Sequence, residues 1–592
     1  MSHRGHAAVL IVACTGLLNA CTSSPTPTDA DVIVIGSGIA GLSAALEANS
    51  QGAGVLIIET SSVAGGHAVK AGGFALVGTP LQERKGLKDT PNIAYDDMMA
   101  WGEDPDPDWV RLFVDNSRSE IHDWLAGFGI QFTILLDTPE DTVPRFHFAG
   151  GAAVNVIIPM LREAAHRDNL DFVMNAEAVN LALNKAGIYN VQSRNTRTGA
   201  LRSYTAPAIV IATGGFQSNL ELVRQNFHPR NSRHGTAPEH LLIGSGKYAA
   251  GTGIRLGQAS GAQLMRMDRQ VTFINGLPDP QDPEHGLHVE NPAAIRINAK
   301  GKRFVNESAH SKAIESAVMS LDQRMHWLVF DDRGRKKFRI RGAVWLNRNT
   351  IASEILNNPD IVHKADTIAA LATAAGLNAD SLQATLDRYN RFVANGEDED
   401  FARFGPLSGQ SQPAGKSVTS PPFYAVRLLP MTRKSMGGLA IDINTQVIGQ
   451  NNQPIDGLFA AGEATGVAGI NGSHGGSGTF LAPSVLTGRI AGRNSAASAR
   501  HAGTITPAFN HTNEQPLITT AANPEVPLMT SAEVSGLLKH ERAGYWHWER
   551  SHTIVIERAL ACTDCHSPDW PTKPATTLHQ QLLKLETCRQ CH

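Results

Sequence analysis

The strongest constraint on the fold lies in residues 31–59, where an apolar strand, a glycine turn, a helix and a second strand follow one another. The strand "DVIVI" leads into "GSGIAG", which sets Gly36, Gly38 and Gly41 in the spacing G-x-G-x-x-G, and the second strand, "VLIIE", ends on Glu59. Such glycines allow a tight turn, close approach of backbone to a pyrophosphate and close packing of helix on strand, while the acidic residue can accept hydrogen bonds from a ribose. The segment therefore predicts a Rossmann-like dinucleotide-binding unit.

Four further segments distinguish between the dinucleotides FAD and NAD, which the glycine turn alone does not. They read "AGGHAVKAGG" (64–73), "IVIATGGF" (209–216), "GLFAAGEATG" (457–466) and "GTFLAPSVLTGRIAG" (478–492). In this order, and over residues 30–500, they resemble the flavoprotein superfamily of fumarate reductase, succinate dehydrogenase, flavocytochrome c, urocanate reductase and 3-ketosteroid dehydrogenase. The resemblance implies that FAD is the cofactor and that its further binding residues are Gly65, Gly66, His67, Gly72, Gly73, Thr213, Gly214, Gly462, Glu463 and Ser484.

The resemblance leaves the attachment of FAD open. In succinate dehydrogenase the segment around His67 carries a histidine bonded covalently to FAD, whereas several relatives bind FAD without a bond. His67 is therefore expected either to form that bond or to donate a hydrogen bond to the flavin. Glu463 is expected near the ribityl or ribose part of FAD, and "APSVLTGRIAG" is expected to start a helix aimed at the flavin ring, where a helix N-terminus stabilises negative charge.

A chain of 592 residues is too long for one core, so several domains are expected. The resemblance implies an α/β fold with a discontinuous FAD-binding domain (31–267 and 426–502) and an inserted α+β capping domain (268–425). Inside the cap, "SLQATLDRYNRFVANG" carries apolar residues at helical spacing. A net charge of −3 gives no basic field, which excludes a nucleic-acid-binding protein.

The N-terminus predicts export. "MSHRGH" is followed by 12 residues, "AAVLIVACTGLL", that are too few to span a bilayer and suit a signal peptide over residues 1–20. The run ends in "LLNAC", which resembles a bacterial lipobox and implies a lipid anchor on Cys21; a plain signal peptide with an incidental cysteine is the alternative. Thr22 after that cysteine favours the outer membrane of a Gram-negative bacterium, with residues 21–30 as a tether on the periplasmic side.

The C-terminus carries two Cys-x-x-Cys-His patterns, which use every cysteine outside the predicted leader and its anchor. They are formed by Cys562, Cys565 and His566, and by Cys588, Cys591 and His592. A zinc ribbon and a pair of disulfides need no histidine directly after the second cysteine, whereas covalent c-type haem does. The cysteines would form thioethers to the porphyrin, and each histidine would give an axial ligand to haem iron.

Two haems need two further axial ligands, and four histidines lie nearby in the sequence. His552 and His579 are the preferred distal ligands, followed by His547, with His540 also in reach. The segment 503–530 is rich in Thr, Pro and Asn and reads as a linker. Residues 531–592 are then a small, mostly α or irregular dihaem cytochrome c domain, in which the porphyrins replace much of the core.

The substrate side departs from the family pattern. Fumarate reductases place a catalytic arginine four residues after the glutamate of "RFVNE"; here that glutamate is Glu307 and the fourth residue is Ser311. Where relatives have a histidine pair before "TMGG", this chain has Arg433 and Lys434, and Thr252 replaces an aspartate. A family arginine after the second FAD motif is replaced in "NGSHGG". Fumarate and succinate are therefore not the expected substrates.

The replacements still predict a polar active site made of His310, Arg433, Lys434, Ser473 and His474. The basic pair can hold a carboxylate or polarise a carbonyl, and either histidine can carry a proton near neutral pH. A solvated pair at the cap edge is the alternative for Arg433 and Lys434. Arg145 and His147, in "PRFHFAGG", are expected to support the structure.

Taken together, these features predict a periplasmic flavocytochrome c. FAD would dehydrogenate or reduce a carbon–carbon bond next to a carbonyl or carboxyl group, and the two haems would pass electrons to or from a periplasmic or membrane redox partner. An enoate-type respiratory reductase and a non-catalytic electron-transfer flavocytochrome are the alternatives.

Overall fold

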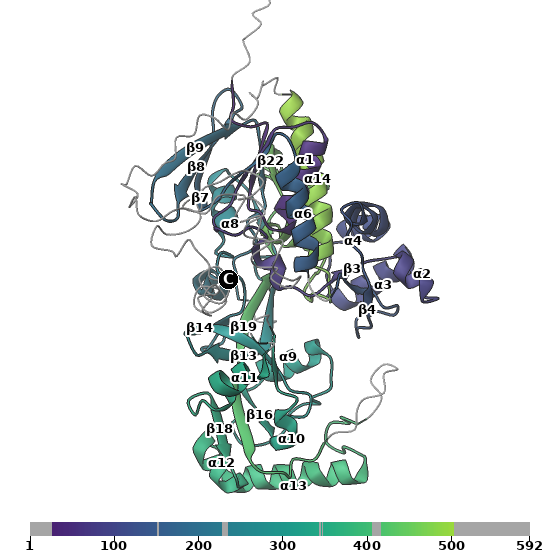
Figure 1. The fold of residues 1–592 in the computed structure, drawn as a ribbon, viewed down its shortest axis with the longest axis vertical. Coiled ribbons are helices and arrows are strands. Elements are labelled where there is room, and N and C mark those ends of the chain that lie inside the picture. Colours follow the sequence, from purple (N-terminus) through teal and green to yellow (C-terminus); the bar gives the residue numbers. More distant parts are fainter. Residues whose placement is uncertain are drawn as a thin grey trace, which may run out of the picture.

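The computed structural model of the protein describes residues 27–501, apart from 151–152, 228–234, 342–344, 346 and 405–415. The predicted signal peptide, the linker and the dihaem domain therefore lie outside the described residues. Figure 1 shows an upper part and a lower part, each built around its own sheet. They are joined by two long neighbouring strands, β13 (Gln270–Asp279) and β19 (Phe423–Ser435).

The upper part is organised around a six-stranded sheet in the order β21-β22-β10-β1-β2-β6. Its strands are β21 (Gln446–Ile448), β22 (Pro454–Ala460), β10 (Ala208–Ile211), β1 (Val32–Ile35), β2 (Val55–Ile58) and β6 (Leu170–Val173). All neighbours pair in parallel except β21 and β22. The central strands read VIVI, VLII and AIVI and are buried at every position, as expected of a parallel sheet covered on both faces.

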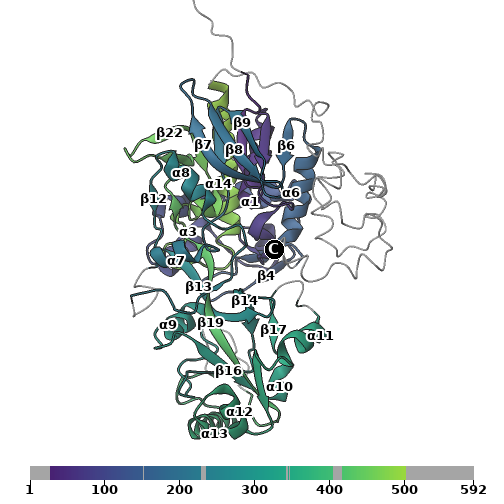
Figure 2. The ribbon, with the colours of Figure 1, turned by 90° about the vertical axis from the view of Figure 1, so that its left-hand side faces the viewer.

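Three helices cover one face of this sheet: α1 (Ile39–Ser50), α6 (Val154–His166) and α14 (Leu481–His501). The other face carries an antiparallel sheet of β7 (Ala176–Leu183), β8 (Tyr189–Asn195) and β9 (Leu201–Ala206), seen in front of the main sheet in Figure 2. The upper part is thus a layered α/β unit, as the glycine turn predicts.

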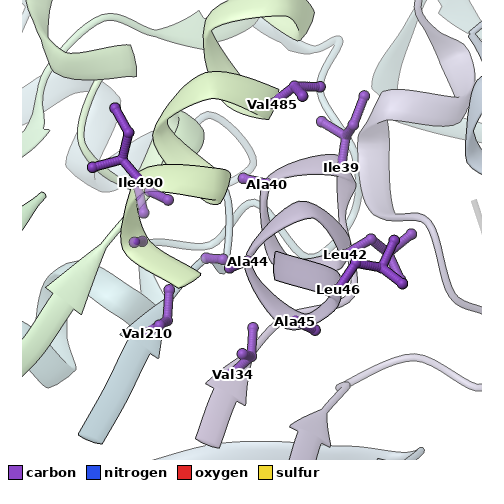
Figure 3. Close-up of a cluster of buried hydrophobic side chains, with 14 of the residues drawn as sticks. Val34, Ile39, Ala40, Leu42, Ala44, Ala45, Leu46, Val210, Val485 and Ile490 are labelled. Atoms are coloured by element: carbon purple, nitrogen blue, oxygen red, sulfur yellow. The ribbon is translucent and has the colours of Figure 1, made fainter. Parts of the chain in front are cut away.

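Helix α1 is held between the sheet and α14. In Figure 3, Ala40 and Ala44 face α14, while Leu42 points to the opposite side. Two glycines of α14 make the close contact feasible: a Cβ on Gly488 would lie 2.4 Å from the carbonyl oxygen of Ala40, and one on Gly492 would lie 2.3 Å from that of Ala44. Close packing of α14 fixes the first turn of α1, which is the turn that faces the cofactor site.

The lower part is an eight-stranded sheet. Its main order is β11-β14-β13-β19-β16-β15, with β17 on β14 and β18 on β19. The strands not yet bounded are β11 (Leu242–Ile243), β14 (Asp282–Glu290), β15 (Ile295–Ile297), β16 (His326–Phe330), β17 (Arg339–Ile340) and β18 (Val362–Ala365). Helices α12 (Ile368–Ala375) and α13 (Ala379–Asn395) pack on one face through a separate apolar core, and α9 (Ser311–Met319) packs beside β13. The helix expected in the cap is α13.

The sequence-based cap boundary at residues 425–426 falls inside β19, which runs without a break from the lower sheet to the cofactor site. Strand β11, from the segment assigned to the FAD domain, pairs with β14 and β19 of the lower sheet. The cap is therefore tied to the upper part by continuous strands.

The remaining elements are short and surround these two sheets. Strands β3 (Phe74–Ala75), β5 (Phe146–Phe148) and β4 (Ile134–Leu136) form a small sheet. The other elements are α2 (Pro80–Arg84), α3 (Pro91–Gly102), α4 (Pro107–Asn116), α5 (Trp124–Ala126), α7 (Leu220–Gln225), α8 (Thr252–Ala259), α10 (Asp332–Arg335), α11 (Arg348–Ile351), β12 (Leu264–Met265) and β20 (Gly438–Leu439). The short 3₁₀ helices are η1 (Gly66–Lys70), η6 (Gly462–Ala464) and η7 (Val467–Gly469), and the π-helical segments are η2 (Ser117–Asp123) and η5 (Ala352–Leu356). Within the described residues, no helix combines the length and the apolar character that crossing a bilayer requires.

Arg145 and His147 hold β5 in place. The Arg145 guanidinium is buried and pairs with three carboxylates, those of Asp89 at 2.7 Å, Asp97 at 2.6 Å and Asp141 at 3.0 Å. The His147 ring lies 2.8 Å from the Thr79 hydroxyl through Nε2 and 2.6 Å from the Arg145 carbonyl oxygen through Nδ1. Both side chains have structural partners, which agrees with the supporting role expected for them.

Candidate cofactor and active site

A cleft opens at the carboxyl ends of β1, β2 and β10, where parallel sheets of this kind bind ligands. The empty space in it, including the part open to solvent, is about 1410 Å³. Most of the predicted FAD residues line it, namely Gly36, Gly38, Glu59, Gly66, His67, Thr213, Gly214, Glu463 and Ser484. Segments more than 400 residues apart in the sequence therefore meet in one elongated cleft.

The glycine turn has the geometry that a pyrophosphate requires. Gly36 has a φ of +105°, and a Cβ there would lie 2.5 Å from the Ala212 carbonyl oxygen. A Cβ on Gly41 would lie 1.9 Å from the carbonyl oxygen of Gly36, whereas a Cβ on Gly38 would meet no atom within 4 Å. Gly38 thus presents bare backbone to the cleft. It is also the N-cap of α1 and makes no side-chain cap, so the helix N-terminus can receive phosphate oxygens.

Glu59 is held in a fixed orientation at the end of β2. Its Oε2 accepts hydrogen bonds from the backbone N–H of Ser37 at 2.8 Å and from the Ser37 hydroxyl at 2.6 Å, and its Oε1 accepts one from the N–H of Ser61 at 2.8 Å. The carboxylate is 7 % exposed and lines the cleft. This placement fits the ribose contact that the sequence predicts.

Five of the predicted cofactor residues do not line the cleft: Gly41, Gly65, Gly72, Gly73 and Gly462. A Cβ on Gly73 would lie 2.2 Å from the His147 carbonyl oxygen, and one on Gly462 would lie 2.7 Å from the Ala40 side chain. The lack of a side chain at these two positions lets neighbouring segments pass close to one another.

At the other end of the cleft, Glu463 is enclosed beside β19. Its Oε1 accepts a hydrogen bond from the N–H of Ser435 at 2.8 Å, and burial raises the pKa of this carboxyl above its usual range. Gly215 makes room for the pair, because a Cβ there would lie 2.6 Å from the same Oε1. Thr213 also lines the cleft, and its hydroxyl accepts the N–H of Gly253 at 3.1 Å in the first turn of α8.

Arg433 lies in the cleft wall and contacts His67. Its Nη1 donates to the Gly244 carbonyl oxygen at 2.7 Å and lies 3.1 Å from Nε2 of His67. The guanidinium carbon is 5.5 Å from the centroid of the Phe273 ring. Because an arginine only donates hydrogen bonds, Nε2 of His67 is the acceptor in this contact. Burial, reinforced by Arg341, lowers the pKa of Arg433 to about 10.

Lys434, the next residue, also lines the cleft. Its Nζ lies 4.0 Å from the centroid of the Phe480 ring, a cation–π contact. Burial lowers the pKa of this ammonium most, and the charge of Arg433 lowers it further. The charge of Glu463 raises it in part, and the pKa is about 7. The basic pair is thus enclosed at the cofactor site, which argues against a solvated pair at the cap edge.

The other three predicted catalytic residues, His310, Ser473 and His474, meet elsewhere and do not line the cleft. Ser473 donates to Oδ1 of Asp104 at 2.6 Å, and Nδ1 of His474 lies 3.5 Å from Oε1 of Glu103. These two partners belong to the loop after α3. The pKa of His474 is lowered, first by burial and then by the Lys312 charge.

His310 reaches the same loop from the cap. It is the N-cap of α9, and its Nδ1 accepts the N–H of Ala313 at 3.2 Å. Its ring lies 5.5 Å from that of Trp101, and Lys312 forms an ion pair with Glu103. The three predicted residues therefore gather where α9 of the cap meets the end of α3.

The structure also shows where the family glutamate, Glu307, lies, together with Ser311 and Thr252, two of the positions at which this chain differs from fumarate reductases. The Glu307 side chain is 4 % exposed and pairs with Arg303 at 2.7 Å, so it supports the cap. Ser311 begins α9 and is exposed, and Thr252 lines the cleft at the start of α8.

Sequence reasoning missed several residues of the site. Ser37 and Ser61, which orient Glu59, lie inside or next to quoted motifs and could have been found from their spacing. Phe480 lies in the fourth motif and carries the contact to Lys434. Residues 246–249 line the cleft but belong to no motif, so only the fold brings them there.

Comparisons with known proteins agree with this geometry. The model of the FAD binding domain family matches residues 31–481. The chain is 29 % identical over 493 residues to a probable fumarate reductase of Shewanella frigidimarina, covering 82 % of this chain and 77 % of that one. It is 28 % identical over 576 residues to a KsdD-like steroid dehydrogenase of Mycobacterium tuberculosis, covering 83 % and 100 %. An open conformation of a flavocytochrome c3 fumarate reductase superposes with a TM-score of 0.65 and 26 % identity, covering 80 % of this chain and 79 % of that one.

The family match spans both the upper and the lower part of the described structure, and it includes the first three FAD motifs after the glycine turn and the start of the fourth. The relatives named above comprise both reductases and dehydrogenases. The chain therefore belongs to the FAD binding domain family, within the flavoproteins that include fumarate reductase and 3-ketosteroid dehydrogenase, and is an FAD-dependent oxidoreductase.

Proposed function

We propose that the protein is a periplasmic flavocytochrome c that dehydrogenates or reduces a carbon–carbon bond next to a carbonyl or carboxyl group. FAD, when bound, supplies the exchange of a hydride and two electrons with the substrate. Two c-type haems would carry the electrons singly to or from a redox partner.

The observation that carries the proposed chemistry is the position of Arg433 and Lys434. They lie near the end of β19, the strand that runs from the cap sheet into the cofactor cleft. A substrate bound between cap and cofactor would meet both cations. Two enclosed positive charges can polarise a carbonyl or hold a carboxylate, and so stabilise the charge that develops on the activating group during hydride transfer.

We further propose that the substrate is neither fumarate nor succinate. Ser311, at the position of the family's catalytic arginine, is exposed and begins α9. The cations of this chain come from β19 instead. Dehydrogenation is the direction we favour, because no arginine acid stands at that position and the glycine spacing after His67 is like that of the ketosteroid dehydrogenases. A steroid dehydrogenase among the similar proteins supports the same direction.

The proposals of two haems and of a lipid anchor rest on the sequence. Cys562, Cys565, Cys588 and Cys591, with His566 and His592, lie outside the described residues, as do Cys21 and the preferred distal ligands His552 and His579. Two Cys-x-x-Cys-His patterns behind an export signal support covalent haem. The similarity to a flavocytochrome c3 fumarate reductase supports a flavin and haem in one protein.

A steady-state assay tests the reaction. The purified holoprotein is offered unsaturated acids and enones with reduced methyl viologen, and their saturated counterparts with ferricyanide, under nitrogen. We expect turnover of at least one pair, and a large loss of turnover in Arg433→Met with FAD still bound. The absence of turnover with every pair in both directions would favour the non-catalytic electron-transfer alternative.

A further inference from the structure

We propose that Lys434 transfers the proton that accompanies hydride transfer, a role that sequence reasoning gave to His310 or His474. The inference rests on the proposed function and names the residue that completes its chemistry. It follows from where each candidate side chain lies and from what each already binds.

The position of Lys434 is the first argument. It lies near the end of β19 and pairs in register with Val271 of β13, the other strand that joins the cap to the upper part. It lines the cleft, as does Phe480, whose ring lies 4.0 Å from its Nζ. The ammonium is therefore at the junction of the cap and the cofactor site, where hydrogen transfer between substrate and flavin would take place.

The competing groups are poorly suited to move a proton at that point. Arg433 shares the cleft, but a guanidinium stays protonated in proteins, and this one is held by Gly244 and His67. Nδ1 of His310 is used as the N-cap of α9. His474 lies against Glu103, and neither histidine lines the cleft.

The charges around Lys434 allow it to gain and lose a proton. Arg433 on the same strand and Glu463 from η6 are the charged groups that act on it, and the third neighbour is the uncharged Phe480 ring. Among the described residues Lys434 forms no ion pair, so no salt bridge fixes it in the charged state. Enclosure and the Arg433 charge bring its pKa to about 7, and a proton-transfer group works best when its pKa is near the working pH.

The bonds, protons and electrons of the proposed hydrogen transfer balance in both directions. In reduction, one alkene carbon receives the hydride and the neighbouring carbon takes a proton from Lys434: a C–H bond forms, an N–H bond breaks and a neutral amine remains. The amine regains a proton from water through the open cleft. In dehydrogenation the neutral amine removes the proton, and the ammonium then releases it to water. The two electrons pass between substrate and FAD in either direction.

Three variants test the assignment: Lys434→Arg, Lys434→Ala and, as a matched control, Lys364→Arg. The control alters a lysine that also lies over an aromatic ring, 5.8 Å from Tyr424, but that does not line the cleft. Lys434→Arg keeps a positive charge that cannot be lost, so we expect turnover to fall about 100-fold while FAD binding stays within a few-fold. Methylamine and ethylamine should restore part of the turnover of Lys434→Ala, whereas Lys364→Arg should match the unaltered protein.

A second readout needs no substrate. The absorbance spectrum of bound FAD, followed from pH 5 to 9, should show a transition near neutral pH in the unaltered protein and none in Lys434→Arg. Wild-type turnover in Lys434→Arg, or no amine rescue of a Lys434→Ala protein that binds FAD, would overturn the proposal. If the unaltered protein turns over no substrate but its spectrum titrates and Lys434→Arg abolishes the transition, the proposed function fails while the titration of Lys434 stands. If turnover is found and the transition survives in Lys434→Arg, the assignment to Lys434 fails alone.

Discussion

The sharpest structural prediction concerns two glycines of the same turn, Gly38 and Gly41, each replaced by alanine. A Cβ on Gly38 meets no protein atom within 4 Å and faces the cleft, whereas a Cβ on Gly41 would lie 1.9 Å from the carbonyl oxygen of Gly36. The two variants add the same methyl group three residues apart. They should nevertheless fail in different ways, Gly38→Ala in cofactor binding and Gly41→Ala in folding.

The magnitudes follow from the same distances. Gly38 has φ −66° and ψ 179°, which alanine adopts without strain, so the free energy of unfolding of the apoprotein should stay within about 1 kcal/mol of its original value. The added methyl group blocks the approach of backbone to a pyrophosphate, and FAD should bind at least about tenfold more weakly, or about 1.4 kcal/mol. Gly41→Ala gains about 1 kcal/mol of helix propensity, but overpacking against a rigid carbonyl costs up to about 3 kcal/mol, so the apoprotein should lose roughly 2 kcal/mol.

Two measurements separate these outcomes. Denaturant unfolding of the apoproteins gives the free energy of unfolding, and quenching of FAD fluorescence gives the affinity. Wild-type FAD affinity in Gly38→Ala would refute the placement of the pyrophosphate at this turn. An apoprotein of Gly41→Ala as stable as the unaltered one would refute the close contact between α1 and the turn.

Four further predictions concern other parts of the chain. Burial lowers the pKa of His147 to about 4 from 6.5, so the folded state binds the proton less readily than the unfolded state; stability should be full above about pH 6.5 and fall by roughly 3 kcal/mol on going to pH 4, and His147→Gln should flatten that slope in denaturant titrations. Arg145→Met leaves three carboxylates without their cation and should cost about 3–5 kcal/mol of unfolding free energy; a loss below 1 kcal/mol would contradict this. Acid precipitation should release FAD into the supernatant, because Nε2 of His67 accepts a hydrogen bond from Arg433; flavin that stays with the protein would show a covalent bond. A pyridine haemochrome assay should find two haems in the full chain and none in a chain ending at residue 501, which should keep its FAD.

Much of the upper part can be predicted from the sequence because its signals are local. The turn around Gly36 needs positive φ, strands β1 and β2 are apolar at every position, and Glu59 follows β2 directly. Spacing alone places these residues at one end of a parallel sheet. Helix α13 can also be predicted from the sequence, because its apolar residues recur at helical spacing.

The active site is harder to predict because its residues depend on long-range packing. The family resemblance predicts Arg433 and Lys434 as active-site residues, but the path of β19 is what brings their side chains to the cofactor cleft. His310 and His474 are chemically suited to carry a proton, but capping of α9 and the loop after α3 give them other partners. The type of a residue shows which chemical roles it can take, but the contacts it makes in the fold determine which of those roles it has.

The most direct test of the central claim is one anaerobic spectroscopic experiment on the full holoprotein. The flavin and the haems are reduced with dithionite, excess reductant is removed, and unsaturated acids and enones are added one at a time; the oxidised protein is treated with the saturated counterparts. At least one unsaturated compound should reoxidise both flavin and haems, or one saturated compound should reduce both, and Arg433→Met should slow either change. Spectra that stay unchanged with every compound in both directions would contradict the central claim.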